Sequence, residues 1–138
     1  MLASSVFTLV AAFAASAVAV QPRTTYATWP AKNFKEACSP GDCNSDFDVS
    51  APAGYYKGAP AFTAHCHLTN KQGWTDCEAS GTKVQASWNA AGQGQQVKVS
   101  VAHLWTEAGA NYNATGSAEF AASETTFQLP VNQVTGVA

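Results

Sequence analysis

Short stretches in which apolar and polar residues alternate recur along this chain, and they limit its fold more than any other feature. Residues 82–88 and 97–101 have an apolar side chain at every second position, and residues 112–120 and 124–131 repeat the pattern. This alternation is typical of a β-strand with one buried face. The stretches follow one another about every ten residues with turn residues between them, and no window holds a helical period. The sequence therefore predicts an all-β domain, a single small antiparallel barrel or sandwich.

The segments before residue 83 fit the same fold. Residues 44–51 alternate in the same way and predict a further strand. Residues 26–30 predict an edge strand that ends at Pro30, because proline has no backbone N–H to donate to a neighbouring strand. Residues 52–60 contain two glycines and two prolines, which predicts a loop. Residues 61–80 predict a two-stranded hairpin that reverses near its middle.

The chain contains four cysteines. An even number in a short exported domain implies disulfides rather than free thiols. Of the three pairings that four cysteines allow, the spacing favours Cys38 with Cys43 and Cys66 with Cys77, because each pair encloses turn-forming residues. In the chain-entropy model, closing loops this short stabilises a fold by roughly 2–3 kcal/mol each.

The N-terminus predicts export. Residues 1–19 carry no charge and are mostly apolar, and they end in small residues that suit signal peptidase. We therefore expect residues 1–19 to be a signal peptide and residues 20–138 to form one secreted, extracellular domain without membrane insertion. The net charge is −2 and the seven basic residues are scattered. That distribution argues against nucleic acid or anionic lipid as the main partner. The sequence leaves the oligomeric state open.

Two histidines lie on either side of a cysteine. His65 and His67 are two apart on a predicted strand, so their side chains share one face, opposite Cys66. If His103 lay nearby, the three imidazoles could hold copper or zinc. Solvent-facing histidines are the more ordinary interpretation, and the cysteine spacings fit the common zinc patterns poorly. The sequence therefore predicts neither a metal nor another cofactor.

Acidic residues also occur in pairs two apart. Asp46 with Asp48, and Asp76 with Glu78, each share a strand face. Paired carboxylates are the groups that glycoside hydrolases use, but neither pair lies in a recognisable motif. We interpret both pairs as solvated side chains.

A histidine with an acid is the best enzymatic alternative. His65 or His103 with Glu78 or Glu107 could act as the acid and base of a ribonuclease-like hydrolase. Such an enzyme needs a cation for phosphate, and the sole arginine, Arg23, lies close to the predicted leader. The sequence therefore predicts a protein that is not an enzyme.

The hairpin segment resembles that of the Alt a 1 family, a group of small secreted fungal proteins that includes allergens and plant-defence elicitors. In that family a Phe-Thr strand leads into a cysteine, and a tryptophan lies three positions before the partner cysteine. The matching residues here are Phe62, Thr63, Cys66, Trp74 and Cys77. The chain has no cysteine after Cys77, where family members carry a second disulfide.

The resemblance implies a β-barrel fold and a function in binding. It implies a secreted effector or elicitor that binds a plant apoplastic protein or cell-surface receptor and triggers or modulates defence. A cell-wall or small-ligand-binding protein is the remaining alternative. The candidate partner-binding residues are Tyr55, Tyr56 and Trp74, since exposed aromatics often anchor contacts, although packing of the loop on the barrel is the more ordinary role for these side chains. Asn113 begins an N-glycosylation triplet.

Overall fold

The computed structural model describes residues 24–69, 73–89 and 96–137. These ranges contain nine strands and no helix, so none of their residues form a helix able to span a membrane. The predicted signal peptide, residues 1–19, lies outside the described residues, as do parts of the reversals expected near residues 70–73 and 89–94.

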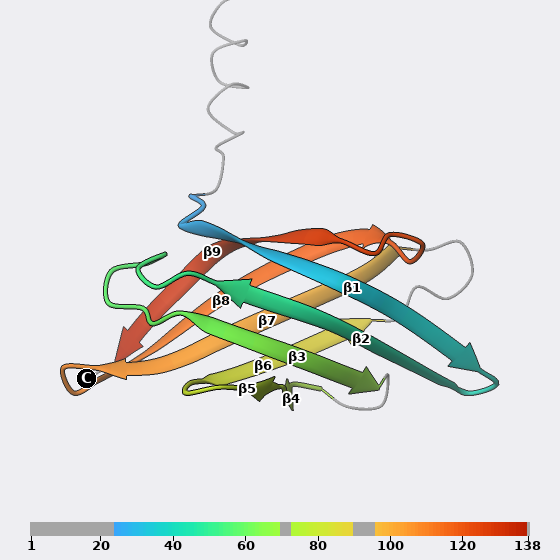
Figure 1. Cartoon of the computed structure of the whole chain (residues 1–138), viewed down its shortest axis with the longest axis horizontal. Helices are drawn as coiled ribbons and strands as arrows, with labels where there is room; N and C mark the ends of the chain where they lie inside the picture. The colour runs from blue at the N-terminus through green and yellow to red at the C-terminus, as the bar shows by residue number, and fades with distance from the viewer. Residues whose placement is uncertain (1–23, 70–72, 90–95, 138) are drawn as a thin grey trace, which may run out of the picture.

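The strands form one antiparallel sheet that curves into a nearly closed barrel (Figure 1). The strands are β1 (Ala27–Ser39), β2 (Asp42–Ala51), β3 (Phe62–Thr69), β4 (Thr75–Asp76), β5 (Glu78–Ala79), β6 (Lys83–Asn89), β7 (Gln96–Glu107), β8 (Ala110–Ala121) and β9 (Phe127–Val137). Their order in the sheet is β4-β6-β7-β8-β9-β1-β2-β3-β5. The predicted all-β antiparallel fold is confirmed.

The prediction of an edge strand that ends at Pro30 is wrong. β1 continues past Pro30 and lies inside the sheet. Its first part pairs with β9, and from Ala31 onward it pairs with β2. Since the β1–β2 ladder begins only after Pro30, that ladder does not need the amide hydrogen that proline lacks. A bulge between Lys32 and Lys35 includes Asn33, whose φ of 59° is left-handed. A bulge of this kind bends the strand locally and increases its twist.

The barrel closes where residues 75–79 cross between β3 and β6, and we call this segment the seam. Its first half, β4, pairs with β6, and its second half, β5, pairs with β3. Between them the amide of Cys77 donates to the carbonyl of Val84 over 2.8 Å. The sequence predicted that residues 74–80 pair with β3 as the second arm of a hairpin. The structure confirms this for β5 and corrects it for β4, which pairs with β6 instead.

Both predicted disulfides are present. The Cys66–Cys77 disulfide joins β3 to the seam, with 4.5 Å between the two Cα atoms. The Cys38–Cys43 disulfide closes the tip of the β1–β2 hairpin around Gly41, whose φ of 86° suits glycine. The described residues contain no free cysteine.

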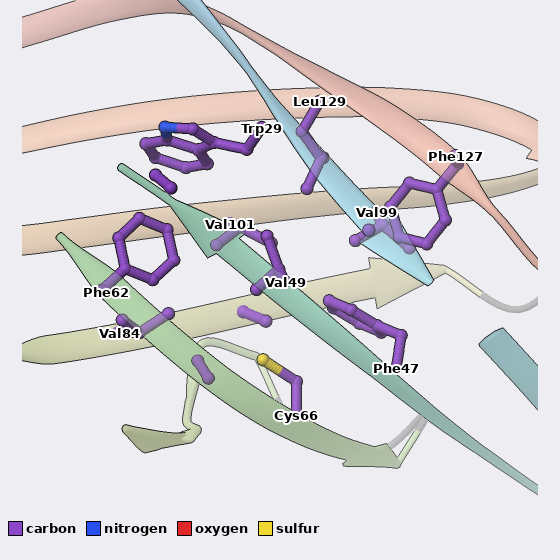
Figure 2. Packing of buried hydrophobic residues seen from close by; sticks show 14 of the residues in the cluster. Trp29, Phe47, Val49, Phe62, Cys66, Val84, Val99, Val101, Phe127 and Leu129 are labelled. Carbon is purple, nitrogen blue, oxygen red and sulfur yellow. The ribbon is translucent and has the colours of Figure 1, made fainter. Parts of the chain in front are cut away.

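The alternating apolar residues fill the barrel interior. Figure 2 shows side chains from several strands pointing toward one another between the two sides of the barrel. Three of the four tryptophans are buried, namely Trp29, Trp88 and Trp105, whereas Trp74 is half-exposed. At one end Phe120 packs on Phe34 and Phe127, with ring centroids 4.9 and 4.2 Å apart. Full burial of a large apolar side chain contributes about 1.5–3 kcal/mol, so this interior supplies most of the stabilisation.

Candidate functional site

His103 lies at the other end of the barrel and is fully buried. It is on β7, at a position that the alternation directs inward. The hydroxyl of Tyr55 lies 2.7 Å from its Nδ1, and the hydroxyl of Thr82 lies 3.0 Å from its Nε2. The imidazole is therefore hydrogen-bonded at both nitrogens, donating through one and accepting through the other.

The surroundings keep His103 neutral. Its ring centroid lies 4.4 Å from that of Phe62 and 5.0 Å from that of Trp105. Burial lowers the pKa of His103 from 6.5 to about 4, because the charged form loses its hydration. Burial also raises the pKa of Tyr55. Both groups are therefore uncharged near neutral pH.

The loop between β2 and β3, residues 52–61, covers this end of the barrel. Tyr55 packs edge to face on Trp29 at 5.4 Å, and Tyr56 packs edge to face on Tyr26 at 5.6 Å. Both loop tyrosines are partly buried and contact the core. Their predicted role in partner binding stays a prediction, and each also holds the loop on the barrel.

A groove lies beside this loop, at the mouth of the barrel. Its volume is about 740 Å³. It is lined by Pro60 of the loop, by residues 81–83 at the start of β6, and by residues of the β7–β8 hairpin. The lining residues of the hairpin are Leu104, Trp105, Thr106, Asn111 and Tyr112. The rings of Trp105 and Tyr112 stack at 5.3 Å, which gives the groove an aromatic wall.

The outer surface of β2 and β3 carries a second group of functional side chains. Cross-strand register places Asp46 opposite His67 and Asp48 opposite His65. Nδ1 of His65 lies 2.7 Å from Oδ1 of Asp48, and Nδ1 of His67 lies 2.9 Å from Oδ1 of Asp46. Nε2 of His65 also lies 3.4 Å from Oδ1 of Asp46. We call these four residues the outer histidine face.

These pairs shift the ionisation of two of the four groups. Hydrogen bonds from Asn33 and then from His65 lower the pKa of Asp48. The same bond to Asp48 raises the pKa of His65, so this imidazole keeps its proton to a higher pH than a free histidine. The imidazoles are 48% and 59% exposed, so water screens the pairs. A hollow of about 680 Å³ borders this face beside Asp48 and Lys32.

The three histidines do not converge. His65 and His67 point outward from β3, whereas His103 points into the barrel. In the described part of the chain, no group of three or more His, Cys, Asp or Glu side chains is arranged to hold a metal ion. The condition on which the three-histidine metal site depended is therefore not met.

In the hydrolase alternative, His65 or His103 pairs with Glu78 or Glu107, but the structure gives both histidines other hydrogen-bond partners. Glu78 stands opposite His65 in the β3–β5 register, but the hydrogen bond of His65 goes to Asp48. The carboxylate of Glu107 lies against Gly58 in the loop. The polar contacts of His103 are with hydroxyls. Sequence reasoning noticed the aspartates and the histidines separately. The register of β2 against β3, which the sequence pattern leaves open, brings them together.

The remaining predicted residues lie on the surface. Trp74 is 49% exposed, just before β4. Asn113 lies on β8, partly buried, and its Oδ1 accepts a hydrogen bond from the hydroxyl of Thr115 over 3.2 Å. Its glycosylation stays a prediction.

No protein-family model, no curated protein and no solved structure matches the chain.

Proposed function

We propose that this protein is a secreted effector or elicitor that acts by binding a plant apoplastic protein or cell-surface receptor, and that this binding triggers or modulates plant defence. The leader-like N-terminus, the two disulfides and the barrel support the proposal, and the hairpin that resembles the Alt a 1 family suggests the kind of target. Two short covalent loops reduce the entropy of the unfolded chain, which helps a small domain to persist outside the cell.

The observation that carries the proposal is the exposure of Trp74. Among the described residues, the large hydrophobic side chains left exposed are Trp74, Tyr26 and Val137. Trp74 lies three residues before Cys77, so the Cys66–Cys77 disulfide holds the nearby chain against β3. A tryptophan presented on a constrained segment loses little entropy on binding, and tryptophan is among the residues most often found at binding hot spots.

The test compares Trp74→Ala with Val137→Ala, a control at another exposed hydrophobic residue. Each purified variant is infiltrated into leaves over a concentration series, and the oxidative burst and cell death are recorded. Loss of a hot-spot residue costs about 2 kcal/mol or more, so Trp74→Ala should need roughly 30-fold more protein for the same response. An unchanged response from a Trp74→Ala protein with an unchanged melting curve would contradict the proposal.

A second comparison separates binding from hydrolysis. His65→Ala/His67→Ala removes both imidazoles of the outer histidine face, and Lys98→Ala changes an exposed residue on β7. If the protein acts by binding through Trp74, both variants should give the wild-type leaf response and no preparation should degrade RNA. Loss of the response together with loss of an RNA-degrading activity would favour the hydrolase.

A further inference from the structure

The groove at the mouth of the barrel has a lining of a particular chemical kind. Its walls combine apolar and aromatic surface, from Leu104, Trp105 and Tyr112, with neutral hydrogen-bonding groups, from Thr82, Thr106 and Asn111. From this combination we infer that the groove binds a short segment of a neutral saccharide chain.

The charges around the groove argue for a neutral ligand. Lys83 is the charged residue of the lining, and its Nζ lies 3.9 Å from Oδ1 of Asp76. Glu107 follows Thr106 on β7 and lies against Gly58. Asp76 compensates Lys83 and Glu107 adds a negative charge, so these groups disfavour an anionic ligand and leave a neutral one acceptable. Hydroxyl groups, which both donate and accept, suit such a surface.

Hydrogen-bonding atoms are available where such a ligand would lie. The hydroxyl of Thr106 donates to Oδ1 of Asn111 over 3.2 Å, which orients the amide and leaves its Nδ2 to donate. Trp105 also lines the groove and is 6% exposed. Its ring contributes aromatic surface to the groove rather than a hydrogen-bonding atom, because its Nε1 is buried.

The groove is held rigidly, so binding would order few side chains. Thr82 is fixed by its hydrogen bond to the buried His103, which Tyr55 holds from the other side. Tyr112 stacks on Trp105, and Gly136 lies so close to the Tyr112 ring that a Cβ there would be 2.7 Å from it. A pre-organised site retains more of its interaction energy as affinity. The volume of 740 Å³ is within the usual range for ligand sites, about 300–1,000 Å³.

This site goes beyond the proposed function and is separate from the Trp74 surface. Thr75 pairs with Ala86, so the chain at Trp74 lies toward the Asn89 end of β6. The groove lies at the opposite end of β6, around Thr82 and Lys83. Saccharide binding and partner binding can therefore be tested with different variants.

The experiment titrates the protein with cellohexaose, xylohexaose and chitohexaose, which are neutral, and with a hexamer of galacturonic acid, which is anionic. A proline-rich peptide represents the other ligand that aromatic grooves accept. Isothermal titration calorimetry and tryptophan fluorescence report binding. The variants are Asn111→Ala and Thr106→Val, with Asn44→Ala as the control, an exposed asparagine on β2 far from the groove.

We expect at least one neutral hexasaccharide to bind, with Asn111→Ala and Thr106→Val each weakening binding about tenfold, or 1.4 kcal/mol. Asn44→Ala and Trp74→Ala should bind as wild type. Binding by none of the neutral saccharides would overturn the inference. So would binding of the acidic hexamer or the peptide alone, or equal affinity in Asn111→Ala and wild type.

Discussion

The hydroxyl of Tyr55 lies 2.7 Å from Nδ1 of His103, so a loop residue is hydrogen-bonded to a histidine that is fully buried in the barrel. Thr82, on the opposite side of the ring, completes the pair of hydroxyls. This relationship links the loop that covers the barrel to the wall of the groove.

Tyr55→Phe should destabilise the protein by about 1–3 kcal/mol, because it leaves a buried imidazole nitrogen without its partner. Tyr56→Phe is the control, since it removes a hydroxyl from the neighbouring ring of the same loop. Urea unfolding measures both. If the two variants lose the same stability, the Tyr55–His103 hydrogen bond contributes nothing beyond an ordinary loop hydroxyl.

The stability should fall as the pH drops from 6.5 toward about 4, the interval between the unfolded and folded pKa of His103. In this interval the unfolded chain binds a proton that the folded protein excludes, so protonation favours unfolding. The full effect of His103 is about 3 kcal/mol, complete once the pH is below the folded pKa. The free energy of unfolding, measured by urea at several pH values, tests this expectation.

Two measurements isolate His103. His103→Gln should remove this pH dependence, and an NMR titration of the wild type should show the ring neutral down to about pH 4. His65→Gln should instead make the loss of stability at low pH steeper. The raised pKa of His65 stabilises the folded protein below pH 6.5, and this contribution is lost as the pH rises, so the variant lacks a stabilising effect that the wild type has at low pH. A His103 ring already protonated at pH 6 would contradict the expectation.

The two disulfides should differ in what they hold. Cys66→Ala/Cys77→Ala should cost roughly 3 kcal/mol and loosen the seam, because in the described part of the chain the seam is the segment that pairs with both β3 and β6. Cys38→Ala/Cys43→Ala should cost roughly 2 kcal/mol and affect the hairpin tip alone. Hydrogen exchange at the amide of Cys77, or of the alanine in its place, reports the seam. Equal seam protection in both variants would show that the first disulfide does not close the barrel.

Gly136→Ala should destabilise the protein by about 1–3 kcal/mol, because the added methyl meets a Tyr112 ring that is stacked on Trp105 and cannot move freely. Gly73→Ala is the matched control, since an added Cβ there has nothing within 4 Å. Thermal melting compares the two. The tryptophan fluorescence of Gly136→Ala should also shift, and an unperturbed melt and spectrum would show that the ring gives way easily.

Much of the barrel could be predicted from the sequence, because the inward direction of every second side chain depends on local geometry. The alternation in β6 and β7 correctly predicted strands, and the turn residues between the cysteines correctly predicted the disulfides. The predicted end of a strand at Pro30 failed, since whether proline disrupts a ladder depends on which neighbour is paired at that position. The seam was missed for a similar reason, as its residues divide between two strands.

The candidate site depended on the tertiary structure. The sequence by itself determined that His65 and His67 share a strand face and that this chain forms disulfide-bonded strands, because both follow from spacing along the backbone. Only the tertiary structure decided that Asp46 and Asp48 stand beside those histidines and that His103 is buried between Tyr55 and Thr82. Register and barrel closure bring together residues that are distant in sequence, and local patterns do not encode those pairings.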